Sequence, residues 1–133
     1  MWQGSGAMTS GAGRPAHLLR GAAGEALAEA WLVQQGLKPL MRNFRCRPGE
    51  IDLVMHETGT LVFVEVRFRR DCGFGTALES VTAGKQRRLL RAAAVYLQQH
   101  GDTLPCRFDV VGIAPGPDGH PAYEWVRDAF RAD

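Results

Sequence analysis

A chain of 133 residues with 45% apolar and 23% charged side chains has ordinary globular composition and suits one compact domain. Its formal net charge of +2 is too small to indicate a partner, so the placement of the charges matters more than their total. No segment approaches the roughly 18 apolar residues that cross a bilayer, and the first 17 residues lack the apolar stretch of a signal peptide. We therefore expect a soluble cytoplasmic protein without a membrane partner.

The cysteines agree with that expectation. Cys46, Cys72 and Cys106 are odd in number and widely spaced, and the sequence contains no CxxC pair. No nearby histidine completes a zinc-binding spacing either. Free thiols in a reducing compartment are the simplest interpretation.

The predicted elements begin after a segment rich in Gly, Ala and Ser. We predict that residues 1–17 form a disordered tail and that residues 18–133 form the single domain. From Leu18 to Gln35 the Ala- and Leu-rich sequence predicts a helix, followed by Gly36 at the position of a left-handed cap. The expected buried stripe of this helix is Ala23, Leu27, Ala30 and Trp31.

Strands and a second helix follow along the chain. An extended segment, Leu37 to Arg45, precedes two β-branched runs that flank Glu57-Thr58-Gly59-Thr60, which is a hairpin signal. A loop from Asp71 to Thr76 leads to a helix from Thr82 to Gln99, then to a strand from Cys106 to Ile113 and a short final element. The expected core stripe of this helix is Leu89, Leu90, Ala93, Tyr96 and Leu97. The order predicts an α/β fold, a mixed sheet with a helix on each side.

The hairpin brings acidic residues together. A two-residue loop at Thr58 and Gly59 puts Asp52 opposite Glu65 and Glu50 opposite Arg67. Because side chains alternate across a strand, one face is wholly apolar and must be core: Ile51, Leu53, Met55, Val62, Val64, Val66 and Phe68. A slipped register is disfavoured because it would spoil that face.

Two opposed carboxylates destabilise each other, and a glutamate inside the apolar run Phe63–Val66 is costly unless it is paired. A divalent cation, Mg²⁺ or Mn²⁺, would compensate, since Mg²⁺ prefers one or two carboxylates with waters and a phosphate. Such an ion can hold a phosphodiester and lower the pKa of an attacking water. An ion-pair cluster, in which Arg67 bridges Glu65 and Asp52, remains the structural alternative.

The motifs GEIDLV (49–54) and FVEVR (63–67) resemble the D…ExK core of nucleases, in which Asp and Glu on adjacent strands ligate metal. More closely, the chain resembles the YraN family (uncharacterised protein family 0102), related to archaeal Holliday-junction resolvases. The similarity runs from Gly21 to Phe130 and includes Gly24-Glu25, Arg42-Asn43, Phe74-Gly75, Lys85, Ala94-Tyr96-Leu97 and RFDVV (107–111). It implies a restriction-endonuclease-like mixed central β-sheet flanked by helices.

The resemblance also implies roles for individual residues. Glu25 on the first helix would complete the metal-binding set with Asp52 and Glu65, although a solvated helix face would explain Glu25 equally well. The family pattern usually has lysine where this chain has Arg67. Arginine stays protonated and cannot act as a base, but its fork can grip a phosphate, so we assign Arg67 to the catalytic set with the three acids. By analogy with resolvases, a homodimer is expected.

Positive charge gathers around the predicted acidic end of the sheet. Ten of the 16 basic residues fall in three groups: Arg42, Arg45 and Arg47; Arg67, Arg69 and Arg70; and Lys85, Arg87, Arg88 and Arg91. A charge run on a helix is most often a solvated face, but the convergence of three groups suits a phosphate backbone. The residues that we expect to bind nucleic acid are Lys85, Arg88, Arg69, Arg70 and Arg42.

Three functions follow from these features. The leading hypothesis is a Mg²⁺- or Mn²⁺-dependent endonuclease that acts on branched or damaged DNA. The second is a nucleic-acid-binding or adaptor domain that kept the nuclease fold without cutting, which Arg67 favours. The third is a protein-interaction module whose carboxylates form salt bridges only.

Other polar and aromatic residues have structural interpretations. We expect Asp109 to pair with Arg107 or with a basic residue of the second helix. Four aromatic residues are expected in the core: Trp31, Tyr96, Phe108 and Trp125.

Overall fold

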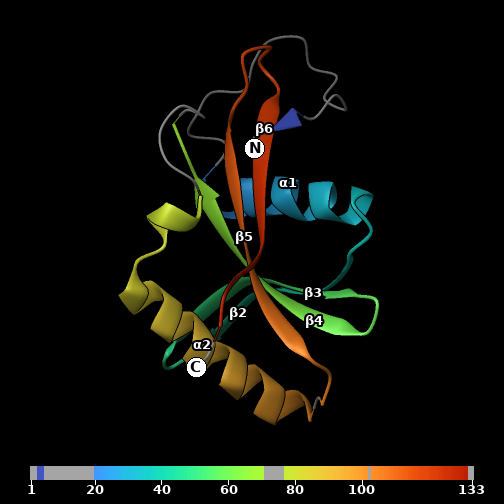
Figure 1. The fold of residues 1–133 in the computed structure, drawn as a ribbon, viewed down its shortest axis with the longest axis vertical. Helices are drawn as coiled ribbons and strands as arrows, with labels where there is room; N and C mark the ends of the chain where they lie inside the picture. Colours follow the sequence, from blue (N-terminus) through green and yellow to red (C-terminus); the bar gives the residue numbers. More distant parts are fainter. Residues whose placement is uncertain (1–2, 5–19, 71–76, 102, 132–133) are drawn as a thin grey trace.

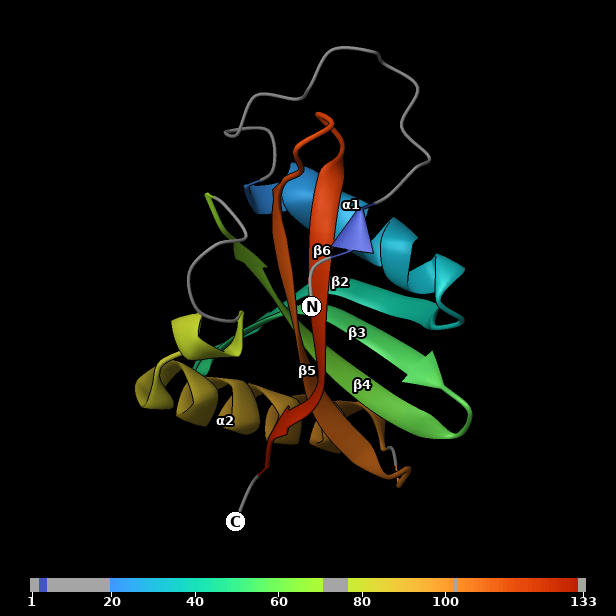
Figure 2. The same ribbon diagram turned by 45° about the horizontal axis from the view of Figure 1, so that its top comes forward.

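The structure, a computed structural model, describes residues 3–4, 20–70, 77–101 and 103–131. Over these residues one mixed sheet has the strand order β1-β6-β5-β4-β3-β2, with α1 and α2 on opposite sides of the strands (Figure 1, Figure 2). The elements are β1 (Gln3–Gly4), α1 (Gly21–Gln34), β2 (Lys38–Cys46), β3 (Gly49–Glu57), β4 (Thr60–Phe68), the 3₁₀ helix η2 (Leu78–Ser80), α2 (Ala83–His100), β5 (Cys106–Pro115) and β6 (Pro121–Phe130). β4 and β5 are parallel and the other neighbours are antiparallel, which confirms the predicted mixed α/β sheet flanked by helices.

The N-terminal segment contributes a short strand. Gln3 and Gly4, inside the segment predicted to be disordered, pair as β1 with Tyr123 and Ala122 of β6. These pairs give partners to the outer edge of β6, whose backbone groups would otherwise lack them. The rest of that predicted tail and the predicted loop at residues 71–76 lie outside the described residues. Among the described helices, none is both long and apolar enough to span a bilayer.

Both helices end within one residue of the predicted ends, at Gln34 and His100. Gly36 has a φ of +107° after α1, and Gly101 has a φ of +62° after α2, conformations that glycine adopts without strain. Thr82 caps the start of α2 by accepting a hydrogen bond from the Lys85 amide at 3.1 Å. This cap fixes the first turn of α2, which carries Lys85.

The buried face of α1 differs from the predicted one. Gly24, Ala28, Trp31 and Leu32 are buried, whereas the predicted Ala23 and Ala30 are exposed and Leu27 is half-buried. The alanines offer little surface, so the large side chains of Trp31 and Leu32 set the rotation of the helix. The prediction for α2 was closer, since Leu89, Ala93 and Tyr96 are buried and Leu90 and Leu97 are half-buried.

Two apolar clusters hold the helices to the sheet. On the α1 side, Trp31 stacks on Tyr123 with ring centroids 4.8 Å apart. On the α2 side, Tyr96 meets Phe44 and Phe63 edge to face. Three of the four aromatic residues expected in the core are buried, and the fourth, Trp125, is half-buried.

The hairpin turn is confirmed. Glu57 pairs with Thr60, and Thr58 and Gly59, with φ of +46° and +81°, form the two-residue loop. Positive φ at both positions is the signature of a type I′ turn, which matches the twist of the strands. The register is the predicted one from this turn to the pair Leu53–Val64.

Beyond Leu53 and Val64 the two strands no longer pair, so the predicted pairs Asp52–Glu65 and Glu50–Arg67 were wrong. β4 continues beside β5, where Glu65 lies opposite Val110, while Glu50 pairs with Arg45 of β2. Asp52 takes over part of the lost ladder, because its Oδ2 accepts the Val66 amide at 2.9 Å. Because the strands diverge here, Asp52 and Glu65 lie side by side without being a cross-strand pair.

The start of β3 also departs from simple alternation. Ile51, predicted to share a face with Leu53, packs instead in the α2-side cluster, and Leu53 lies in the α1-side cluster. On the neighbouring β2, Asn43 has a φ of +56° and falls between the pairs Arg42–Leu53 and Phe44–Ile51. A residue in this left-handed conformation interrupts the regular alternation of side chains, so the face switches beside Asp52.

Candidate metal and nucleic-acid site

Glu65 is the most buried acid of the candidate site. It stands in the middle of the sheet on β4 with 3% of its surface exposed. Two cations contact the same carboxylate oxygen, Oε2: Lys85 Nζ at 3.3 Å and Arg67 Nη1 at 3.4 Å. Burial and the charge of Asp52 nevertheless raise the pKa of Glu65 to about 8, because they outweigh the two cations. Glu65 thus holds a proton more readily than an exposed glutamate does.

Asp52 lies between the other two acids. It is 8% exposed at the point where β3 leaves β4, and the Val66 amide orients its carboxylate. Besides burial, the charge of Asp52 and a hydrogen bond that its carboxylate accepts from the protonated glutamate raise the pKa of both Glu25 and Glu65. Asp52 is therefore within reach of both glutamates.

Glu25 comes to this point from α1. Burial, followed by the charge of Asp52, raises the pKa of Glu25 to about 7, while a hydrogen bond from the Asn43 side chain lowers it. The structure thus brings the three acids of the predicted metal set together from three elements, α1, β3 and β4. Glu25 is half-buried, so its side chain reaches Asp52 while part of it still faces solvent.

The donor set fits a hard cation. The three groups supply only carboxylate oxygens, which suit Mg²⁺ or Mn²⁺ better than a metal that prefers sulfur or imidazole. Over residues 3–4, 20–70, 77–101 and 103–131, no group of three or more His, Cys, Asp or Glu side chains has a ready-made arrangement for holding a metal ion. Mg²⁺ needs no such cage, because it is commonly held by one or two carboxylates with waters and a phosphate.

Arg67 is anchored on the α2 side. Its Nε donates to Ser80 Oγ at 3.1 Å, and Ser80 Oγ in turn donates to the Ala77 carbonyl at 2.6 Å. Its ion pair is with Glu65, and the predicted bridge from Arg67 to Asp52 does not occur among the described residues. Ser80, the residue that positions this guanidinium, carries no sequence signal that would have identified it.

The predicted basic residues are distributed unequally around the site. Lys85 lies at the acids, whereas Arg42 forms an ion pair with Glu29 of α1 at 2.9 Å. Arg88 is exposed, with its backbone packed beside Gly49 at the turn between β2 and β3. Arg70 is exposed and Arg69 half-buried just beyond β4. Lys85 and Arg88 lie on α2, Arg69 and Arg70 follow β4, and Arg42 is engaged with Glu29.

Asp109 on β5 belongs to a separate network. It is fully buried and accepts hydrogen bonds from Arg107 Nε at 3.0 Å, Trp125 Nε1 at 2.9 Å and the Asp128 amide at 2.9 Å. The predicted pairing with Arg107 is confirmed. With its lone pairs used by these donors, Asp109 has a structural role.

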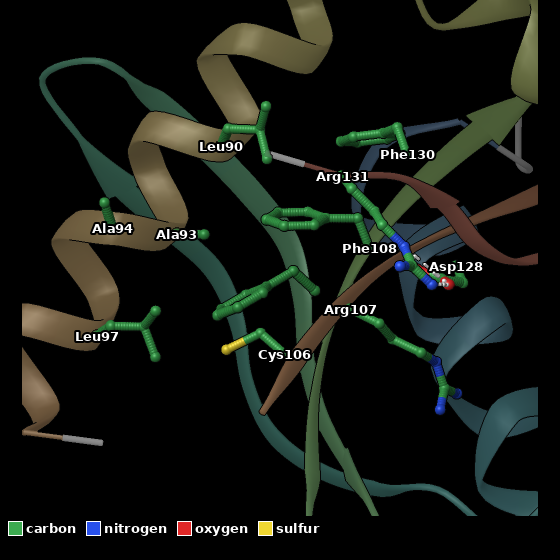
Figure 3. Close-up of a pocket in the computed structure, with 11 residues that line it drawn as sticks. Leu90, Ala93, Ala94, Leu97, Cys106, Arg107, Phe108, Asp128, Phe130 and Arg131 are labelled. Carbon is green, nitrogen blue, oxygen red and sulfur yellow. Dashed lines mark hydrogen bonds and ion pairs between the residues drawn. The ribbon is translucent and has the colours of Figure 1, made fainter. Parts of the chain in front are cut away.

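A pocket of about 560 Å³ lies away from these acids, between α2 and the ends of β5 and β6 (Figure 3). Leu90 and Leu97 line one side, and Phe108 and Phe130, whose ring centroids are 5.1 Å apart, line the other. No residue of the predicted site lines it. The pocket is mainly apolar, so it does not share the chemistry of the acidic site.

Comparison with known proteins gives related sequences of the same length class. A UPF0102 protein of Cupriavidus necator is 54% identical over 116 residues, covering 86% of this chain and 85% of that protein. A UPF0102 protein of Xanthomonas axonopodis pv. citri is 52% identical over 86% of this chain and 93% of its own length. A UPF0102 protein of Symbiobacterium thermophilum is 50% identical over 84% of this chain and 96% of its own length.

Among solved structures, SfsA of Pyrococcus furiosus in complex with Ca²⁺ aligns with a TM-score of 0.36 and 14% identity. The alignment covers 84% of this chain but 63% of SfsA, so the chain spans less than two thirds of that protein, and the likeness is too weak to carry an argument. The model of the uncharacterised protein family UPF0102 matches residues 24–113, which include all three acids. The chain therefore belongs to the uncharacterised protein family UPF0102, the YraN family that its GEIDLV and FVEVR motifs resemble.

Proposed function

We propose that this protein is a Mg²⁺- or Mn²⁺-dependent endonuclease that cuts phosphodiester bonds in branched or damaged DNA. The observation that carries the proposal is the meeting of Glu25, Asp52 and Glu65 where β3 and β4 diverge. Two buried acids with a half-buried third beside them are costly, and the raised pKa values of Glu25 and Glu65 record that cost. A divalent ion would remove it.

The residues of the chain divide the work as follows. Asp52 and Glu65 would hold the ion, and Glu25 would complete the set from α1. Bound there, the ion would polarise a phosphodiester and lower the pKa of an attacking water. Arg67, fixed by Ser80, would contact a phosphate oxygen with its planar fork. The resemblance of the two motifs to the D…ExK core of nucleases supports the same assignment.

Binding of DNA would depend on the basic residues that border the acids. Lys85 and Arg88 lie on α2 and Arg69 and Arg70 follow β4, and Lys85 contacts Glu65 at 3.3 Å. We place Arg42 outside this set, because its guanidinium is engaged with Glu29. Contacts of this kind are to the phosphate backbone and carry no base sequence information. We also propose a cytoplasmic location, since the free cysteine Cys46 suits a reducing compartment.

The test is cleavage by the purified protein with Mn²⁺ or Mg²⁺ on linear, nicked, forked and four-way DNA. We expect cleavage of at least one structured substrate, and a loss of about 10²-fold or more in Glu65→Gln. Glu124→Gln is the matched control, because Glu124 is a buried glutamate that accepts the Ala77 amide at 2.7 Å, which glutamine can also do. Cleavage that survives in Glu65→Gln would remove the assignment.

The second candidate is a domain that binds nucleic acid and does not cut. The observation that favours it is Arg67, whose guanidinium cannot take a proton from water and is tied to Ser80. The variant Arg67→Lys separates the two functions. Cleavage that appears only in Arg67→Lys would show that the natural chain has lost catalysis, whereas cleavage by the natural chain supports the first proposal.

A further inference from the structure

Lys85 is the cation that contacts the most buried acid of the site. It lies in the first turn of α2, where its amide is held by Thr82 Oγ1, so its backbone position is fixed. Its side chain is 33% exposed and its ammonium lies 3.3 Å from Glu65 Oε2. The ammonium therefore stands between the buried carboxylate and solvent.

Lys85 and Arg67 share the same oxygen but differ in how they are held. Arg67 has a second anchor, the hydroxyl of Ser80. For Lys85, Glu65 is the one ion-pair partner of the ammonium within the part of the chain that the structure describes. A lysine side chain also has a flexible four-carbon stem, whereas the guanidinium is a rigid fork. Of the two cations, Lys85 is thus the one that can leave.

We propose that Lys85 is an exchangeable counterion, which occupies the cation position on Glu65 in the metal-free protein and moves to the substrate phosphate when a divalent ion binds. The proposal rests on the proposed function and deepens it. An ammonium and a divalent ion on one carboxylate oxygen would repel each other strongly at a separation of a few ångström. The metal can bind only if the ammonium moves, and a phosphate held at the site is the nearest new partner for it.

The charge of the competitor sets the sign of the effect. Removing the Lys85 ammonium favours every cation that binds Glu65, a proton as well as a metal ion. The gain is about twice as large for a doubly charged ion as for a proton, because the Coulomb energy scales with charge. Mn²⁺ binding should therefore tighten when the ammonium, 3.3 Å from Glu65 Oε2, is removed.

The experiment measures Mn²⁺ affinity of the full chain at pH 7.5 from the electron paramagnetic resonance signal of free Mn²⁺. We expect Lys85→Met to bind Mn²⁺ about tenfold more tightly than the natural chain. Lys85→Arg, which keeps the charge, should stay within about twofold of it. Arg91→Met, an exposed basic residue farther along α2, is the matched control and should leave the affinity unchanged. In the same variants, affinity for four-way DNA with Mn²⁺ should fall for Lys85→Met.

The outcomes separate the inference from the function on which it rests. If the natural chain binds Mn²⁺ and Lys85→Met binds it equally or less tightly, the counterion role is overturned and the metal site stands. If neither protein binds Mn²⁺, both are overturned. If the ion pair between Lys85 and Glu65 had only a structural role, Lys85→Met would instead lower the melting temperature and weaken Mn²⁺ binding. If Lys85→Met does not fold by circular dichroism, Lys85→Gln takes its place with the same expected direction.

Discussion

Glu65 and Asp109 are buried acids on neighbouring parallel strands, β4 and β5, but they have different surroundings. Asp109 accepts an indole N–H, a backbone amide and a guanidinium in good geometry. Glu65 has two cations crowded on one oxygen at 3.3 and 3.4 Å and another acid beside it. Burial alone therefore does not identify a functional acid. A carboxylate whose partners satisfy it is part of the scaffold, and one whose neighbours repel it is a candidate for chemistry.

The largest expected effect is the loss of stability when Asp109, the satisfied acid, is replaced. Asp109→Ala leaves the Trp125 N–H and the Asp128 amide without their acceptor and removes one partner of Arg107. We expect a loss of about 3–5 kcal/mol in the free energy of unfolding, measured by urea denaturation. Asp109→Asn keeps an oxygen acceptor and should lose less. A change below about 1 kcal/mol in Asp109→Ala would mean that this network is not structural.

A second measurement concerns pH and Glu65. Its folded pKa of about 8 lies above its ordinary value of 4.5. Below that ordinary value the group is protonated in both states, and above 8 it is ionised in both. Between them the unfolded chain releases the proton and the folded chain retains it, so stability falls as pH rises.

The variant that isolates this effect is Glu65→Gln, which cannot ionise. In the presence of a chelator, its advantage in unfolding free energy over the natural chain should grow from pH 5 to pH 8 and then level off. Adding Mn²⁺ should reduce the advantage, because only the natural chain would gain a bound ion. A difference that is constant with pH would contradict the raised pKa of Glu65.

The smallest expected effect sharpens the role of neutral donors. Trp125→Phe removes the N–H that Asp109 accepts at 2.9 Å and keeps an aromatic ring beside Trp31. We expect a loss of about 1.5–3 kcal/mol, since one hydrogen bond to a charged acceptor is removed while other donors remain. Thermal unfolding would measure it, with Val33→Ala on the exposed face of α1 as the control that should change little. A loss equal to that of Asp109→Ala would mean that the indole alone holds the network.

The sequence was sufficient for features that depend on nearby residues. The type I′ turn needs positive φ at Thr58 and Gly59, and the register follows from it as far as Leu53 and Val64. The approach of Asp52 to Glu65 also follows from the hairpin, although not as a cross-strand pair. The position of Glu25 required the family resemblance, because nothing in the helix sequence tells which side faces the acids.

The remaining features depend on contacts between distant parts of the chain. The divergence of β4 from β3 is visible only once β5 is in place beside Glu65. From the sequence alone, Arg42 could bind either DNA or an acidic residue of the chain. Its ion pair with Glu29 follows only from the packing of α1 against β2. The contact of Ser80 with Arg67 could not be predicted, because no sequence motif indicates which residue of η2 will lie next to Arg67.

The local hairpin and the distant helix have a consequence for the order of folding. A hairpin with a two-residue turn forms in roughly microseconds, whereas parallel pairing of β4 and β5 must wait for the long connection through α2 to close. We therefore expect Asp52 and Glu65 to approach each other before Lys85 arrives with α2. The incoming helix meets an uncompensated negative charge, which attracts it, and high salt should weaken that attraction and slow the late step of refolding.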